Sequence, residues 1–123
     1  MWGCYFATCL IYITLIVDNS TQTIDIEEKP LLGDPHNRYV YFDDIDCIKY
    51  EHGVVDKYNP GESDRPVQVS YGCVLIYLQN EKSLEVSFGF DDSGVKSNRR
   101  LAQELSVATG KELICEGVYR LNR

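Results

Sequence analysis

The chain has 123 residues, of which 44% are hydrophobic, and its 19 acidic and 12 basic side chains give a formal net charge of -7. This length predicts one domain, residues 1–123, that buries an apolar core without metal or disulfide staples. The negative charge disfavours nucleic acid as a partner and favours a protein with a basic surface.

The N-terminal run from Trp2 to Val17 contains no charged residue. It lacks a basic start, is shorter than the roughly 20 apolar residues of a membrane span, and is rich in Tyr, Thr, Ile and Val. These features predict an apolar strand within residues 1–12. The alternative is that residues 2–17 contact a membrane, because this uncharged run exceeds a typical strand length.

Two hairpins are predicted from alternating apolar and polar residues. Strands over residues 12–18 and 23–28 flank a polar turn, and strands over residues 67–78 and 83–90 flank another. In each hairpin the apolar residues recur at every second position, so each is expected to bury one face. The pattern therefore predicts a twisted antiparallel sheet.

Between the hairpins, residues 39–50 return to strand character. The core candidates of this strand are Tyr39, Tyr41, Ile45 and Ile48. The apolar parity changes within it, which predicts a bulge or bend near Asp43 and Asp44. Residues 53–66 carry two prolines, two glycines and charges of both signs. This composition predicts a long loop.

The C-terminal third holds the one convincing helical pattern, over residues 97–109. Residues 91–94 have turn chemistry, and Ser97 or Asn98 is the expected N-terminal cap. The apolar stripe of this helix is expected to consist of Leu101, Leu105 and Ala108, with Ala102 beside it. Gly110 predicts the end of the helix, and residues 113–121 predict a final short strand.

The five cysteines form no C-x-x-C pair, and an odd number cannot all be bridged within one chain. Cys47 and Cys73 lie in apolar strand contexts, where a free thiol packs as a small hydrophobic group. We therefore expect buried thiols and a cytoplasmic location, since the cytoplasm is reducing. No metal and no cofactor is expected.

The order of hairpin, strand, long loop, hairpin and helix resembles bacterial PH-like domains over roughly residues 13–113. The matching segments are Tyr39-Val40-Tyr41-Phe42-Asp43-Asp44-Ile45-Asp46-Cys47-Ile48 and Ser97-Asn98-Arg99-Arg100-Leu101-Ala102-Gln103-Glu104-Leu105. The resemblance implies a β-rich α+β fold with one C-terminal amphipathic helix. Its sheet would be bent and antiparallel, or a partly open barrel, with about six to seven strands. It also implies an interaction module without catalysis. The chain lacks the basic loop residues with which lipid-binding members hold phosphoinositides, so lipid binding is not implied.

The densest acidic cluster lies in the middle of the chain, and its spacing matches no calcium loop. Carboxylates in such a cluster are suited to docking Lys and Arg side chains. The predicted partner-binding residues are Asp43, Asp44, Asp46, Glu51, Asp56, Tyr58, Glu62 and Asp64. The sequence therefore predicts a non-catalytic, acidic protein-binding domain, and an immunity or inhibitor protein that neutralises a basic toxin or nuclease fits the size and charge.

Two alternatives remain open. One is a PH-like accessory domain of a membrane-associated complex, for which the uncharged N-terminal run is the discriminating feature. The other is a small enzyme, with His52 and Asp46 as its best catalytic candidates. The sequence brings no nucleophile, base and orienting group together, so catalysis is not the expected function.

Overall fold

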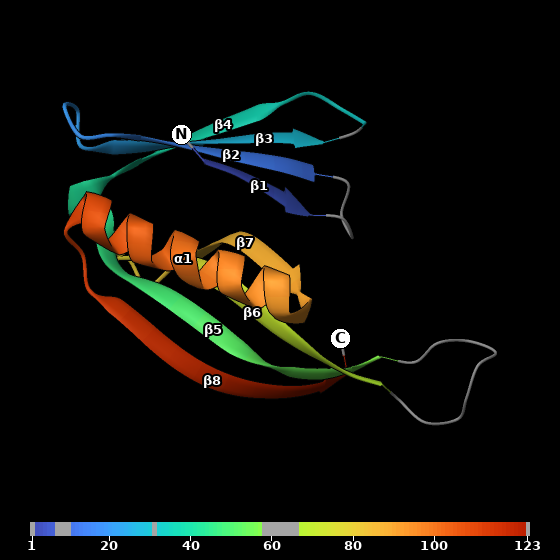
Figure 1. Ribbon diagram of the computed structural model, residues 1–123. Helices are drawn as coiled ribbons and strands as arrows, with labels where there is room; N and C mark the ends of the chain where they lie inside the picture. Colours follow the sequence, from blue (N-terminus) through green and yellow to red (C-terminus); the bar gives the residue numbers. More distant parts are fainter. Residues whose placement is uncertain (1, 7–10, 31, 58–66, 123) are drawn as a thin grey trace.

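The computed structural model describes residues 2–6, 11–30, 32–57 and 67–122, and Figure 1 shows their arrangement in two open sheets and one long helix. The N-terminal sheet is an antiparallel meander with the spatial order β1-β2-β3-β4. Its strands are β1 (Trp2–Phe6), β2 (Ile11–Asp18), β3 (Thr23–Pro30) and β4 (His36–Tyr41). Each strand therefore pairs with its neighbour in the chain.

The C-terminal sheet has the spatial order β7-β6-β5-β8. Its strands are β5 (Ile45–Lys57), β6 (Val67–Leu78), β7 (Ser83–Phe90) and β8 (Leu113–Asn122). Helix α1 (Asp91–Thr109) follows β7 and runs across one face of this sheet, as Figure 1 shows. The helix returns the chain to the far edge, where β8 pairs with β5 in parallel.

One hydrophobic core joins both sheets and the helix. Ile13, Leu15, Ile24 and Ile26 of the N-terminal sheet alternate with more exposed residues, so one face of that sheet is buried. The helix contributes Leu101, Ala102 and Leu105, and the C-terminal sheet contributes Ile48, Val74, Ile76 and Val86. Each fully buried aliphatic side chain stabilises the fold by about 1.5–3 kcal/mol.

The chain passes from one sheet to the other through a single turn of 3-10 helix, η1 (Phe42–Asp44). The Phe42 N–H donates to the Gln22 carbonyl at 2.9 Å, and the Gln79 N–H donates to the Asp44 carbonyl at 2.8 Å. Asp46 then forms a β-bulge, because Ile45 pairs with Leu78 and Cys47 with Tyr77. The bend predicted near Asp43 and Asp44 is confirmed, and it divides the strands between two sheets.

Two side chains predicted for the core point outward. Tyr39 is 63% exposed and Tyr41 is 58% exposed, whereas Val40 between them is 5% exposed. Successive side chains of a strand point to opposite faces, so burial of Val40 places both tyrosines on the outer face. The other two candidates, Ile45 and Ile48, are fully buried as predicted.

The helix begins six residues earlier than predicted, at Asp91. Its first turn contains Asp91 and Asp92, and carboxylates are stabilised at that end of a helix by its dipole. Asn98, an expected cap, is instead buried in the helix interior, where its side-chain N–H donates to the Gly94 carbonyl at 2.8 Å. The end at Gly110 is confirmed, with a left-handed φ of 71°.

The β-rich α+β class, the two hairpins and the single late helix are confirmed. The predicted loop over residues 53–66 is shorter at its start, because β5 continues through Lys57. The expectation of one bent sheet is replaced by two sheets that do not close. In the described residues no helix is both long and apolar enough to span a membrane.

Two of the described cysteines match the prediction and one does not. Cys47 and Cys73 are buried, whereas Cys115 is exposed on the edge strand β8. Burial raises the pKa of the Cys47 thiol, and the neighbouring carboxylate of Asp46 raises it further. Cys47 is therefore held as a neutral thiol, as expected for a packing residue.

Candidate functional site

Five exposed side chains gather where β4 ends, η1 turns and β5 begins. These are Tyr39, Tyr41, Asp43, Asp44 and Asp46, which we call the 39–46 surface. Tyrosine rings offer large contact areas at low entropic cost, and carboxylates attract basic side chains. The surface therefore combines the two residue types that are most useful for docking a cationic protein.

The 39–46 surface is supported by core packing and by backbone hydrogen bonds of the same segment. Val40, Phe42 and Ile45 alternate with its members and enter the hydrophobic core. Backbone hydrogen bonds from η1 and its neighbours to both hairpin turns fix the same segment. Because its supports are packed and hydrogen-bonded, the surface is preorganised, which lowers the entropic cost of binding.

Among the described side chains, the carboxylates of this surface form no ion pair, although Arg38 and Lys82 line the same groove as Asp44. Both ion pairs among the described side chains are made by Lys49, which lies elsewhere. Asp25 on β3 extends the negative surface beside Tyr39, its cross-strand partner, and accepts a hydrogen bond from the Asn37 side chain at 3.4 Å. Exposed carboxylates that follow one another along one segment set up a local negative potential that steers basic partners.

Glu51, another predicted partner-binding residue, lies apart from this surface. At 8% exposure it is buried, and its carboxylate is 3.7 Å from the Lys49 ammonium group. The Cys73 thiol also donates to Glu51 at 3.7 Å. Lys49 forms a second ion pair with Glu116, and the hydrogen bond between them raises the pKa of Lys49. This cluster joins three strands and leaves Glu51 little surface for a partner.

The remaining predicted residues fall at or beyond the end of β5. The backbone of Asp56 is in β5 and pairs with Gln68 of β6. Tyr58, Glu62 and Asp64 lie outside the described residues. Of the eight predicted residues, the structure thus brings together Asp43, Asp44 and Asp46.

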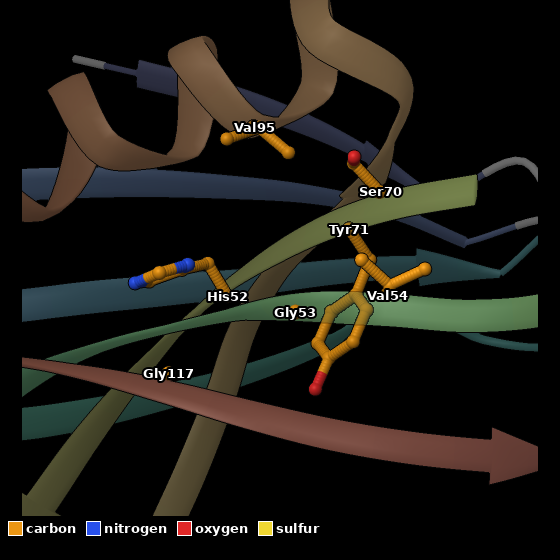
Figure 2. Close-up of a pocket in the computed structure, with 7 residues that line it drawn as sticks. All are labelled: His52, Gly53, Val54, Ser70, Tyr71, Val95 and Gly117. Atoms are coloured by element: carbon orange, nitrogen blue, oxygen red, sulfur yellow. The ribbon is translucent and has the colours of Figure 1, made fainter. Parts of the chain in front are cut away.

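A cavity of about 250 Å³ lies under the first turns of α1, with His52 at its wall (Figure 2). The imidazole stacks on the Tyr50 ring, with 5.5 Å between ring centroids. Figure 2 shows Ser70 and Val95 on one side of the sheet and the Tyr71 ring directed to the other. The cavity is smaller than the roughly 300–1,000 Å³ of most ligand pockets. Of its lining side chains, only His52 and Ser70 present polar atoms near its wall, since the Tyr71 ring points to the other side of the sheet.

The two catalytic candidates of the sequence are not brought together. Asp46 and His52 lie on the same strand, six residues apart, which corresponds to about 20 Å. His52 is exposed on the cavity wall, whereas Asp46 belongs to the 39–46 surface. Among the residues that the structure describes, no group of three or more His, Cys, Asp or Glu side chains is placed to hold a metal.

Sequence reasoning missed the tyrosines of the 39–46 surface and a groove beside them. The groove has a volume of about 460 Å³ and separates β4 from the turn between β6 and β7. The signal available for the tyrosines was strand alternation: if Val40 faces the core, Tyr39 and Tyr41 on either side of it point to the opposite face, which is the exposed one here. The groove depends on how the two sheets meet, which no local pattern encodes.

Comparisons of the chain with protein-family models, with curated proteins and with solved structures found no match.

Proposed function

We propose that this chain is a non-catalytic, acidic binding domain that docks a protein with a basic surface through the 39–46 surface. The observation that carries the proposal is the exposure of two tyrosines beside three carboxylates that form no ion pair among the described side chains. Interfaces concentrate their binding energy in aromatic side chains that become buried when the partner binds, while the surrounding charges set the association rate.

An inhibitor or immunity role is the specific form that we favour. A net charge of -7 on 123 residues would accelerate encounter with a basic toxin or nuclease. The tyrosines would supply the contact area that slows dissociation, since affinity differences among related complexes arise mostly in that step. Inhibition requires only occlusion of the partner, so it needs no catalytic group on this chain.

The test is affinity capture from the source cells, followed by association kinetics of the recovered basic protein at increasing salt. The double variant D43K/D46K should lower the association rate by about tenfold at low salt, because rim charges act mainly on encounter. The matched control is E104K/E112K, which changes the net charge equally but alters exposed residues outside the 39–46 surface.

If both double variants slow association equally, the effect comes from net charge and the 39–46 surface is not the docking site. Recovery of no basic partner would contradict the proposed function altogether. A Y39A/Y41A variant separates the two contributions: we expect faster dissociation with a nearly unchanged association rate.

A further inference from the structure

One edge of β4 pairs with no other described strand, and the backbone groups that point along it can be identified. The Phe42 N–H donates to the Gln22 carbonyl, so these two residues form a hydrogen-bonded pair of the antiparallel ladder. Such pairs recur at every second residue, so Val40 and Arg38 also direct their backbone groups toward β3. The N–H and C=O groups of Asn37, Tyr39 and Tyr41 therefore point away from β3, along the outer edge of the sheet.

The groove described above runs along this edge. Three consecutive residues of β4, Arg38, Tyr39 and Val40, line it. Successive side chains of a strand point to opposite faces, so a cavity that touches three in a row lies beside the backbone. Leu78 and Leu84 form its apolar opposite wall, and a second cavity of about 190 Å³ shares Arg38 and Leu84 with it.

Edge strands of soluble proteins are usually protected by proline, lysine, a bulge or a covering segment. β4 has the sequence His-Asn-Arg-Tyr-Val-Tyr: it contains no proline and no lysine, Arg38 is its one permanently charged residue, and its pairing with β3 is regular. It is an outer strand in the described sheet order. A regular edge strand beside a groove with leucines on its far wall is an arrangement that proteins use to capture an extended peptide.

We propose that an extended segment of the partner adds to the N-terminal sheet as a strand beside β4, within this groove. This inference deepens the proposed function and rests on it. Side chains on one face of the added strand would contact Leu78 and Leu84 and should be apolar. Those on the other face would lie near Tyr39, Tyr41 and Asp25, where lysine or arginine gains cation–π and charge interactions.

The predicted occupant is therefore a basic protein segment that alternates apolar residues with lysine or arginine. Charge argues against a second copy of this chain, since two molecules of net charge -7 would meet along acidic surfaces. Asp44 on the groove wall and Glu28 at its continuation fit a cationic segment, while Arg38 and Lys82, which also line the groove, can pair with its occasional carboxylate.

The probe is a random peptide library displayed on phage and selected on the full chain. Enriched peptides should show the alternating pattern. In amide hydrogen exchange, a bound peptide should slow exchange at Asn37, Tyr39 and Tyr41 by at least about tenfold, because these N–H groups gain partners. The amides of Arg38 and Val40, already paired with β3, should keep their rates.

The matched variants are Tyr39→Pro and Tyr39→Val. Proline removes the outward N–H, which an edge strand tolerates, whereas valine keeps it and loses only the ring. We expect about tenfold weaker peptide binding for Tyr39→Pro and about threefold for Tyr39→Val, given the usual net value of one hydrogen bond or cation–π contact. Circular dichroism checks that Tyr39→Pro is folded, and if it is not, N-methylation of the peptide residues facing β4 replaces it.

No enrichment, equal binding to both variants, or protection outside β4 would overturn the inference. Slow exchange of the Tyr39 amide in the free protein, together with a dimeric mass that Tyr39→Pro abolishes, would show that a second copy occupies the edge. The proposed function is judged separately: if D43K/D46K still slows the whole partner while peptides fail, only strand addition is wrong.

Discussion

The close approach of Gly94 to Gly89 predicts that a normally stabilising substitution is harmful. Gly94 lies in the first half of α1, where alanine would usually improve helix propensity by about 1 kcal/mol. A Cβ at this position would lie 2.7 Å from the Gly89 carbonyl carbon and 3.0 Å from its Cα. Carbon atoms prefer about 3.5–4.0 Å, and neither backbone can rotate away.

Overpacking of this kind costs about 1–3 kcal/mol, and the upper end applies because backbone meets backbone. After the propensity gain is subtracted, Gly94→Ala should lower the free energy of unfolding by about 1–2 kcal/mol. For a chain of this size the melting temperature should fall by about 4–8 °C. Urea denaturation at pH 7, followed by circular dichroism, measures the change.

Two control variants separate contact from backbone effects. Ser93→Ala, at an exposed neighbouring position, should change the stability by less than about 0.5 kcal/mol. Gly110→Ala meets no atom within 4 Å but takes a φ of 71°, so it should cost about 1 kcal/mol through strain alone. If Gly94→Ala is as stable as the parent chain or more so, the helix does not approach β7 as closely as described.

Three further predictions concern buried and charged groups. Asn98→Ala removes a buried amide that forms hydrogen bonds with Ser87 and with the helix backbone. The free energy of unfolding, measured by urea titration, should fall by about 1–3 kcal/mol. An unchanged free energy of unfolding would contradict these hydrogen bonds. The pKa of Lys49 is raised in the folded chain, so its stabilisation is present below its unfolded pKa of 10.5 and lost as pH rises through the folded value. Lys49→Gln should therefore be less stable than the parent at pH 7, and the difference should shrink at pH 11; a constant difference would refute the pairing. In the native protein the Cys115 thiol should react with Ellman's reagent much faster than Cys47, whose pKa is raised, and equal rates would contradict the burial of Cys47.

Local rules were sufficient for much of the fold. Both hairpins, the bend near Asp43 and the helix end at Gly110 follow from turn residues and short-range periodicity. The sequence did not predict that α1 begins at Asp91, because Gly94 and the residues before it are typical of a turn. The role of Gly94 depends on contact with Gly89, which is visible only once strand and helix are packed. The parallel pairing of β8 is equally non-local.

The candidate site was predicted in part, for similar reasons. Charge density identified Asp43, Asp44 and Asp46, and the turn and bulge explain why all three side chains are exposed together. Charge density also assigned Glu51 to the partner-binding residues. The structure instead places its carboxylate beside Lys49 on β5, a contact that the sequence alone does not reveal. Tyr41 was assigned to the core on residue type, and strand parity reversed that assignment.

The position of β8 has a consequence for how the chain is made. β5 ends at Lys57 and lies between β6 and β8, but β8 begins only at Leu113. During synthesis the N-terminal meander has all its pairing partners early, whereas the other side of β5 stays open until α1 and β8 have emerged. A long open edge is a site for intermolecular pairing. The nascent chain is therefore most exposed to misassembly at β5, and slowing translation between β7 and β8 should lower the soluble yield.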